Sequence, residues 1–291
     1  MSEPASEPLT QGAPVTAAVV GGGTMGAGIA HVLLAAGSRV TVAEADPARA
    51  NAAREAVAAS LRKAEDRGKI DQPAAALLAH LSTVDILADL PPGAELVVEA
   101  VPEDLDLKRR VLGEVAAACA EAVLASNTSS LSITALAAGL PGERVVGMHF
   151  FNPVPVQQLV EIVTHERLPA ATLATVRGYA EALGKTVIEV RDSPGFATSR
   201  LGVAVGLEAI RMLEEGVASA EDIDTGMRLG YGWPMGPLRL TDLVGLDVRL
   251  SIAEHLSREL GDRFTPPELL RNKVARGELG RKTGQGFFTW Q

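Results

Sequence analysis

The chain has 291 residues, of which 47% are hydrophobic and 22% are charged, a composition typical of a globular enzyme with one large core or two joined ones. Its 27 basic and 36 acidic residues give a net charge of −9, and no Lys/Arg-rich block interleaves with aromatic residues, which argues against a nucleic-acid partner. The single cysteine, Cys119, leaves no pair for an internal disulfide and no cysteine cluster for a metal, so we expect a reducing, cytoplasmic location and no metal site.

The N-terminal segment, Met1–Pro14, is rich in Ser, Pro and Glu and is predicted to be disordered. The uncharged run that follows, Val15–Ala36, has the length of a membrane span. Glycines, Thr24 and His31 interrupt it, and the tail before it is acidic with no basic residue. We therefore expect neither a signal peptide nor a membrane segment.

A dinucleotide-binding motif comes first among the predicted elements. The apolar run Ala17–Val20 leads into a glycine-rich turn and then a helical pattern that Gly37 can end. The turn residues predicted to bind the cofactor are Gly21, Gly23, Thr24, Met25 and Gly26. Their glycine spacing permits a tight turn, close approach to a pyrophosphate and close helix packing. A second strand, Arg39–Ala43, ends before Glu44, whose carboxylate can accept both ribose hydroxyls and so favours NAD over NADP.

Helices and strands then alternate as far as Arg191. The predicted helices are Pro47–Arg67, Asp104–Cys119 and Ala170–Leu183, and the predicted strands are Ala94–Ala100, Ala122–Ser126, Arg144–Phe150 and Thr186–Val190. This order predicts an α/β fold with a Rossmann-like, doubly wound parallel sheet and helices on both faces. Beyond it the patterns are helical, so we expect an NAD-binding domain over 15–191 and an all-α domain over 192–291.

His149 is the candidate general base. It ends an apolar strand, and the carboxyl ends of parallel strands are where α/β sheets place their chemistry. An alcohol that is oxidised to a carbonyl must lose a proton, and imidazole is suited to accept it. Glu161, twelve positions on, could orient the ring. Taken alone, a histidine in such a position is more often a structural residue than a catalytic one.

Several further motifs give a resemblance to a known family. These motifs are Gly21 to Gly28, Glu99 to Glu103, Ser126 to Leu131, His149 to Pro153, Gly230 to Pro237 and Gly280 to Phe288. Together they resemble the L-3-hydroxyacyl-CoA dehydrogenases, including the single-function bacterial 3-hydroxybutyryl-CoA enzymes, over nearly everything after Val15. The resemblance implies NAD-dependent oxidation of an L-3-hydroxyacyl-CoA to a 3-oxoacyl-CoA by a homodimer joined through its helical domain.

The resemblance also implies roles for individual residues. His149 would be the acid/base group with Glu161 as its partner, and Ser129 would contact both the substrate hydroxyl and the cofactor. Further positions implied to contact NAD are Glu103, Lys108, Asn152 and Lys282, and those implied to contact the CoA part are Ser60 and Arg67.

One position departs from the family pattern. Ser199 stands where the family usually has an active-site asparagine, and a hydroxyl replaces a carbonyl and an NH2. This difference leaves two alternatives open. One is a crystallin-like dehydrogenase of a free hydroxy acid or sugar acid, and the other is a protein that binds NAD without catalysis.

Overall fold

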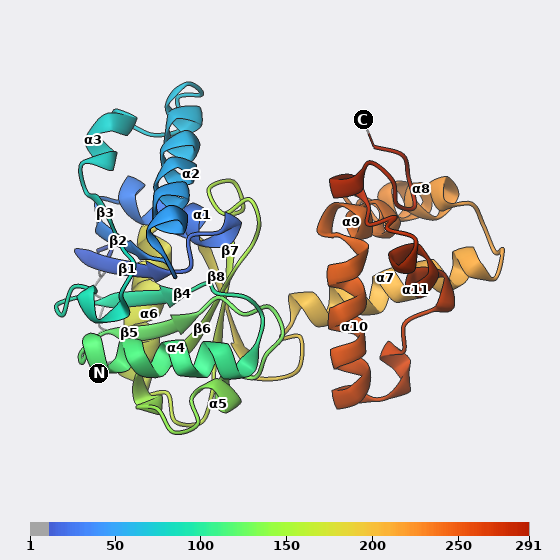
Figure 1. Cartoon of the computed structure of the whole chain (residues 1–291). Coiled ribbons are helices and arrows are strands. Elements are labelled where there is room, and N and C mark those ends of the chain that lie inside the picture. The colour runs from blue at the N-terminus through green and yellow to red at the C-terminus, as the bar shows by residue number, and fades with distance from the viewer. Residues whose placement is uncertain (1–11, 291) are drawn as a thin grey trace, which may run out of the picture. The chain divides into compact units, whose positions relative to one another are not determined.

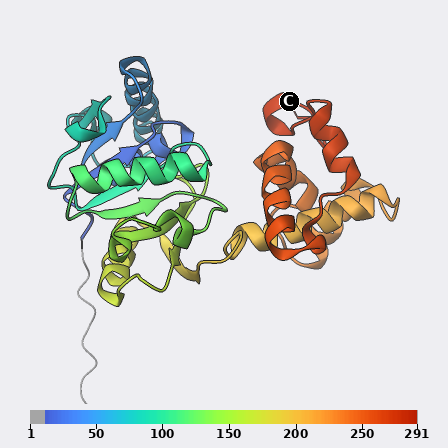
Figure 2. The ribbon, with the colours of Figure 1, turned by 60° about the horizontal axis from the view of Figure 1, so that its bottom comes forward.

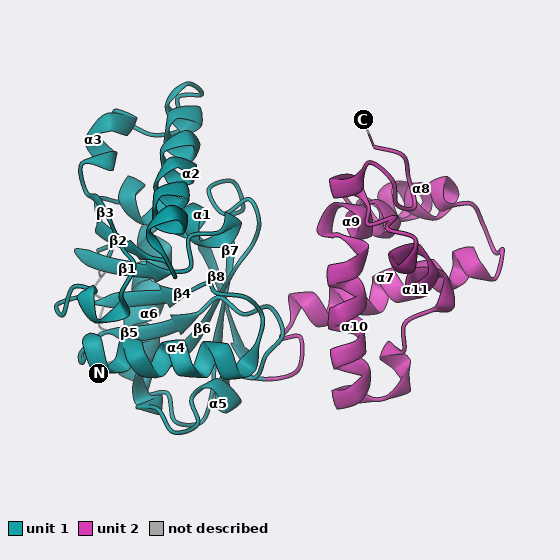
Figure 3. Cartoon of the chain, viewed as in Figure 1, with its two compact units in different colours: residues 1–192 teal, residues 193–291 magenta. Residues whose placement is uncertain are grey.

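The computed structural model describes residues 12–290. The chain divides into two compact units, residues 1–192 and 193–291 (Figure 3). The boundary predicted from the sequence lies between residues 191 and 192. Of the predicted N-terminal tail, residues 1–11 lie outside the described residues, whereas Pro14 is buried and its carbonyl accepts a hydrogen bond from the Ser38 hydroxyl. Among the described residues, every helix is too short or too polar to span a bilayer.

The first unit is built on one eight-stranded sheet with the order β3-β2-β1-β4-β5-β6-β7-β8 (Figure 1). The strands are β1 (Thr16–Val20), β2 (Arg39–Ala43), β3 (Leu81–Val84), β4 (Leu96–Glu99), β5 (Val123–Ser126), β6 (Val145–Phe150), β7 (Leu159–Thr164) and β8 (Thr186–Arg191). The chain winds outward in both directions from β1, so the strand order reverses between β1 and β4, where such sheets bind ligands. The Rossmann-like prediction is confirmed.

The sheet is mostly parallel, with one exception that the sequence did not indicate. β7 runs antiparallel to β6, and β8 is parallel to β7, so only β1 to β6 share one direction. Two strands were not predicted from the sequence: β3, which has only four residues, and β7, which has six. The missed reversal matters for the site, because β7 carries Glu161.

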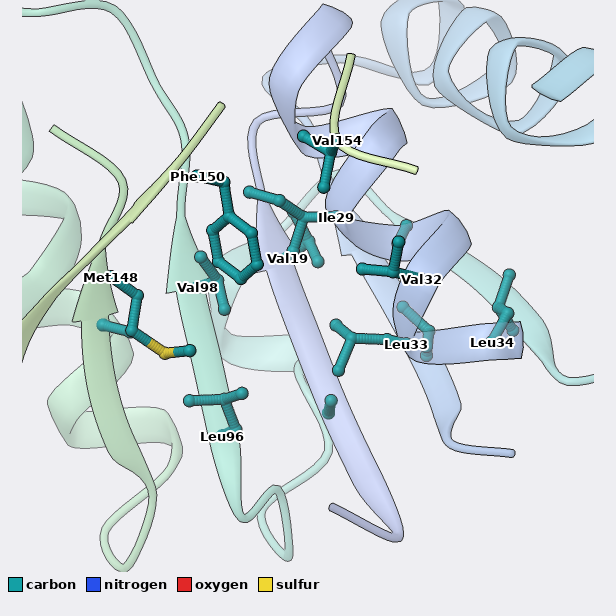
Figure 4. Packing of buried hydrophobic residues seen from close by; sticks show 14 of the residues in the cluster. Val19, Ile29, Val32, Leu33, Leu34, Leu96, Val98, Met148, Phe150 and Val154 are labelled. Carbon is teal, nitrogen blue, oxygen red and sulfur yellow. The ribbon is translucent and has the colours of Figure 1, made fainter. Parts of the chain in front are cut away.

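Helices cover both faces of the sheet (Figures 1 and 2). They are α1 (Thr24–Ala35), α2 (Pro47–Glu65), α3 (Ala74–Leu78), α4 (Leu105–Ala118), α5 (Ile133–Leu136) and α6 (Ala170–Ala182). On one face, α1, α2, α3 and α6 share a core cluster with β1, β4 and β6, part of which Figure 4 shows around Val19, Val98 and Met148. On the other face, α4 packs on β4 and β5, and α5 packs on β6. This two-sided burial explains why the strands read as continuous apolar runs.

Local side-chain caps set where several helices begin. Asp46 accepts a hydrogen bond from the Arg49 backbone N–H ahead of Pro47 at the start of α2, and Asp104 accepts from the Leu107 N–H at the start of α4. The predicted helices over these segments are therefore confirmed. Cys119 is buried just beyond α4, and burial raises the pKa of its thiol, as expected of a packed rather than a nucleophilic cysteine.

The second unit is helical, as predicted from residue 196 onward. Its helices are α7 (Thr198–Glu214), α8 (Ala220–Gly230), α9 (Pro237–Val244), α10 (Leu246–Leu260) and α11 (Glu268–Ala275). Their buried residues form one cluster centred on Leu207, Leu238 and Leu256. Short 3-10 turns occur at Leu87–Asp89, Gly142–Arg144, Asp262–Phe264 and Arg281–Thr283.

Asp242 anchors the C-terminal segment of the second unit. Its carboxylate is 1% exposed and accepts hydrogen bonds from the Phe287 N–H (2.8 Å), the Phe288 N–H (2.9 Å) and the Trp290 indole N–H (2.8 Å). A Cβ at Gly286 would lie 2.2 Å from its Oδ1, so only glycine fits there. The glycine-rich motif near the C-terminus is therefore explained in part by packing around one buried acid.

We predict that Asp242→Asn destabilises the second unit by about 2 to 4 kcal/mol, because the amide NH2 cannot accept hydrogen bonds and leaves buried donors unsatisfied. Thermal unfolding followed by near-UV circular dichroism would measure the change. Asp247→Asn is the matched control: Asp247 is 39% exposed and paired with Lys282, so its loss should cost below about 1 kcal/mol. Equal stability of the two variants would show that Asp242 does not anchor the segment.

Candidate active site

The glycine turn after β1 has the geometry of a phosphate-binding loop. Gly21 has φ +93°, a left-handed conformation that side chains disfavour. A Cβ at Gly26 would lie 1.7 Å from the Gly21 carbonyl oxygen, so this glycine allows α1 to pack against the turn. At Gly23 a Cβ would meet nothing within 4 Å, so the backbone there faces open space that a ligand can enter.

The N-terminus of α1 and the carboxylate of Glu44 lie beside this turn. Gly23 caps α1, and the first turn of the helix holds no acidic side chain, which leaves N–H groups suited to a phosphate. Glu44 accepts hydrogen bonds from the Gly22 N–H (2.7 Å) and the Ala45 N–H (3.1 Å). These bonds fix a negative charge next to the turn.

A cavity of about 810 Å³ opens here, and Gly21, Gly23, Thr24, Met25 and Glu44 all line it. Its apolar walls include Ile86, Leu87 and Val111. Apolar walls, a helix N-terminus and one fixed acid suit an adenine ring, a pyrophosphate and a ribose, respectively. Thus the residues fit a dinucleotide. Gly26 does not line the cavity, because it packs against the turn itself.

His149 and Glu161 form a buried pair. They lie directly opposite each other in the antiparallel register of β6 and β7. His149 Nδ1 is 2.6 Å from Glu161 Oε2, and the two residues are 7% and 0% exposed. The Phe151 ring packs on the imidazole, with 4.5 Å between centroids. A carboxylate at Nδ1 places the proton of a neutral ring on that nitrogen, so that Nε2 carries the lone pair able to accept a proton.

Lys108 and Glu99 form a second buried pair, at the ends of β4 and β5. Lys108, on α4, is 1% exposed, and its Nζ donates to Glu99 Oε1 (2.7 Å) and to the Val101 carbonyl (3.0 Å). Glu99 also accepts from the Val101 N–H (2.7 Å) and from the Ser126 hydroxyl (2.6 Å). The positive charge of Lys108 is therefore paired within the protein, next to the end of β4.

Glu103 accepts several hydrogen bonds from the loop that follows β5, which we call the serine loop (residues 127–131). Its Oε1 accepts from the Thr128 hydroxyl (2.7 Å) and from the backbone and hydroxyl groups of Ser129 and Ser130. Its Oε2 lies 3.6 Å from Lys108 Nζ. Burial opposes ionisation, but Lys108 and the serine-loop donors outweigh it and hold the pKa of Glu103 below its ordinary value. Glu103, Lys108 and Ser129 therefore belong to one connected network.

The loop after β6, residues 151–158, is held from two sides. Val154 packs against α1, where a Cβ at Gly28 would come within 2.9 Å of it. Lys185 Nζ donates to the carbonyls of Val154 (2.6 Å) and Gln157 (2.8 Å), and burial lowers the pKa of Lys185. Asn152, predicted to contact NAD, is exposed on this fixed loop.

No individual role was predicted from the sequence for three of these residues, Glu99, Asn127 and Lys185. Glu99 carries a signal in hindsight, since it is an acid inside an apolar strand and Lys108 follows nine positions later. Asn127, whose Oδ1 accepts from the Phe150 N–H (2.9 Å), ties the end of β5 to the end of β6. Lys185 gave no local signal, because its acceptors are carbonyls distant in sequence.

The residues predicted to contact CoA lie on or just beyond α2. Ser60 is half-buried, and its hydroxyl is 2.8 Å from Nδ1 of the buried His31. Burial, with a smaller contribution from Lys185, lowers the pKa of His31 to about 4, so this ring is neutral. Arg67 follows the end of α2 and is exposed. The structure thus leaves the Arg67 cation open to solvent.

Two predicted site residues belong to the second unit. Ser199 lies in the first turn of α7 and is half-buried. Lys282 Nζ lies 2.6 Å from both carboxylate oxygens of Asp247. Burial opposes ionisation of Asp247, but Lys282 outweighs it and lowers the pKa of this carboxyl.

Comparisons with known proteins agree with this geometry. Residues 16–193 match the NAD-binding domain of 3-hydroxyacyl-CoA dehydrogenase, and residues 195–290 match the C-terminal domain of the same family. The chain is 42% identical to a 3-hydroxybutyryl-CoA dehydrogenase of Mycobacterium tuberculosis, over 94% of this chain and 97% of the relative. It is 38% identical to the mitochondrial hydroxyacyl-coenzyme A dehydrogenase of Sus scrofa, over 94% and 90%.

A solved structure gives the same result. The crystal structure of an (S)-3-hydroxybutyryl-CoA dehydrogenase from Ralstonia eutropha superposes with a TM-score of 0.90 at 39% identity, covering 96% of this chain and all of that one. The matched regions include both units and every residue of the candidate site. The chain therefore belongs to the 3-hydroxyacyl-CoA dehydrogenase family and is an NAD-dependent oxidoreductase.

Proposed function

We propose that this enzyme oxidises the hydroxyl of short L-3-hydroxyacyl-CoA thioesters, 3-hydroxybutyryl-CoA among them, with His149 as the acid/base group. The observation that carries the proposal is the buried His149–Glu161 pair at the carboxyl end of β6. Relatives of 38 to 42% identity with names that specify 3-hydroxybutyryl-CoA or hydroxyacyl-CoA support the substrate class.

The chemistry requires a proton and a hydride to leave the substrate. When bound, NAD supplies the nicotinamide ring that accepts the hydride from C3. His149 Nε2 accepts the hydroxyl proton as the carbonyl forms, and Glu161 stabilises the resulting imidazolium through Nδ1–H. In the reverse direction the same proton returns to the substrate oxygen.

The surrounding residues position the reactants. We assign Ser129 to the substrate hydroxyl and the cofactor, held in place by Glu103, and Asn152 to the cofactor from the loop after β6. Lys108 acts through Glu99 and Glu103 and sets the charge of this network. We also assign Ser199 to the substrate and Lys282 to the cofactor.

We also propose a homodimer in a reducing, cytoplasmic compartment. Large apolar side chains are exposed on the second unit, including Leu201, Leu243, Val244 and Val248. Exposed apolar residues of this kind are typical of a surface that a second copy covers. The single cysteine, Cys119, is buried and has no disulfide partner.

A direct assay separates this function from a dehydrogenase of free acids. NADH formation should be rapid with L-3-hydroxybutyryl-CoA and at least about 100-fold slower with free 3-hydroxybutyrate or gulonate, which lack the CoA part that supplies binding energy. Comparable rates with a free acid would contradict the proposal.

We predict that Glu44 sets the preference for NAD. A 2′-phosphate would be forced against this carboxylate, so kcat/KM with NADP should be at least about 100-fold below that with NAD. Glu44→Ala should lower the ratio of kcat/KM with NAD to kcat/KM with NADP by about tenfold or more. The variant loses both the repulsion of the 2′-phosphate and the contacts with the ribose. Asp85→Asn, which removes another acid lining the same cavity, is the control and should leave the ratio unchanged. Similar kcat/KM values with both cofactors in the unmodified enzyme would refute this role.

We predict that His149→Gln lowers kcat by about two to four orders of magnitude, as expected for loss of a positioned proton acceptor. NAD binding, followed by fluorescence titration with NADH, should be retained because the glycine turn is untouched. Glu161→Gln keeps a hydrogen-bond acceptor at Nδ1 and should lower kcat less. Near-normal turnover of His149→Gln would mean that another residue is the base.

We predict that Arg67→Ala raises KM for the CoA thioester by about threefold to tenfold and leaves KM for NAD unchanged. The lost cation is exposed, so screening reduces the effect of a charge-assisted contact with a CoA phosphate. Arg62→Ala is the matched control, since Arg62 is an exposed cation within α2, whereas Arg67 lies beyond the end of that helix. Equal KM values for Arg67→Ala and the unmodified enzyme would move the CoA site to another surface.

A further inference from the structure

Glu99 is a buried acid to which the proposed mechanism assigns no contact with substrate or cofactor. It ends β4 and is 0% exposed. Its Oε1 accepts hydrogen bonds from Lys108 Nζ and from the Val101 N–H, both at 2.7 Å, and its Oε2 accepts from the Ser126 hydroxyl at 2.6 Å. These donors belong to α4, to the chain just beyond β4 and to β5. Glu99 is therefore a negative charge fixed in place on a rigid strand.

Lys108 lies between Glu99 and a second carboxylate. Its Nζ is 2.7 Å from Glu99 Oε1 and 3.6 Å from Glu103 Oε2. An ammonium has three N–H donors, and two of them are used by Glu99 and by the Val101 carbonyl. The Glu103 oxygen is beyond hydrogen-bond distance. The lysine thus pairs with the acid on the strand, although another acid is close by.

Glu103 is held less firmly than Glu99. Its side chain is 37% exposed and lies on the loop between β4 and α4, so it can move more easily than a strand residue. Its Oε1 accepts from the Ser129 N–H (3.0 Å) and from the Ser129 hydroxyl (3.2 Å). Both oxygens belong to one planar carboxylate. A movement that brings Oε2 into a close ion pair with Lys108 would therefore change the hydrogen bonds that Oε1 makes with Ser129.

We propose that Glu99 is a positioning residue whose charge holds Lys108 away from Glu103, so that Glu103 keeps Ser129 in place for catalysis. The proposal rests on the proposed function, in which Ser129 contacts the substrate hydroxyl and the cofactor. Without the Glu99 charge, Lys108 would be a cation of 1% exposure with Glu103 as the other acid within 4 Å. A buried charge requires a counter-charge, so Lys108 would draw Glu103 towards itself and away from Ser129.

The first test is the kinetics of Glu99→Gln, which removes the charge and keeps the shape. With 3-hydroxybutyryl-CoA and NAD, kcat should fall by about 10-fold to 100-fold, as expected when a group that contacts the reactants is displaced by about 1 Å. Glu99→Asp keeps the charge but changes the shape, and should lower kcat less. Ser126→Ala is the matched control, because it removes a donor to the same carboxylate and leaves both charges. Its kcat should stay within about threefold of the unmodified enzyme, although a buried hydrogen bond is lost.

The second test is backbone hydrogen exchange of the enzyme without ligands, which reports on the serine loop directly. In Glu99→Gln, the Ser129 and Ser130 N–H groups, both bonded to Glu103 Oε1, should exchange about tenfold faster or more. Exchange in β4 and β5 should change less, because their backbone pairing is untouched. The double variant Glu99→Gln/Lys108→Met carries neither buried charge, so its serine loop should exchange as in the unmodified enzyme. This variant also provides the test if Glu99→Gln alone does not fold, because it leaves no buried cation unpaired.

Three results would overturn the proposal. The first is a normal kcat in Glu99→Gln. The second is a loss of kcat with faster exchange spread over β4 and β5, which would make Glu99 purely structural. The third is a serine loop that exchanges faster in the double variant than in the unmodified enzyme. Inactivity of the unmodified enzyme towards 3-hydroxybutyryl-CoA would instead refute the proposed function, and the exchange rates would still decide whether Glu99 holds the serine loop.

Discussion

The fully buried carboxylate of Glu161 constrains the architecture of the catalytic unit. A buried charge needs a partner, and the structure supplies His149 across the one antiparallel pairing of the sheet. If β7 ran parallel to β6, the carboxyl end of β7 would lie at the same edge of the sheet as His149. Because β7 is antiparallel to β6, Glu161 in the middle of β7 lies opposite the His149 ring. On its other side, β7 pairs with β8. Rigid strands thus fix the imidazole more firmly than a loop could.

The neighbouring strand ends are held by charge in a comparable way. Glu99 and Lys108 join β4, β5 and α4, and Glu103 extends that network to the serine loop. Such networks are favourable only when each member is satisfied, and here every carboxylate accepts several donors. The cost of burying these charges is offset by a preorganised site, in which donors and acceptors need little rearrangement when substrate and cofactor bind.

Much of this arrangement could be predicted from the sequence, because local rules determine it. Glycine spacing and the acid at Glu44 predict the cofactor turn, and the apolar run before His149 predicts its place at a strand end. The direction of β7 and the burial of Lys108 could not be predicted, since both depend on residues distant in sequence. Periodicity indicates that a segment is a strand but carries no information on which way its neighbour runs.

Glu161 fixes the tautomer of His149, and ¹⁵N NMR of histidine-labelled enzyme can observe that tautomer. The chain has five histidines, and the His149 signals are those missing from the spectrum of a His149→Gln sample. Two-bond ¹H–¹⁵N correlations distinguish a protonated from an unprotonated ring nitrogen. For the neutral ring, we expect a proton on Nδ1 and a lone pair on Nε2. A neutral ring with its proton on Nε2 would contradict it.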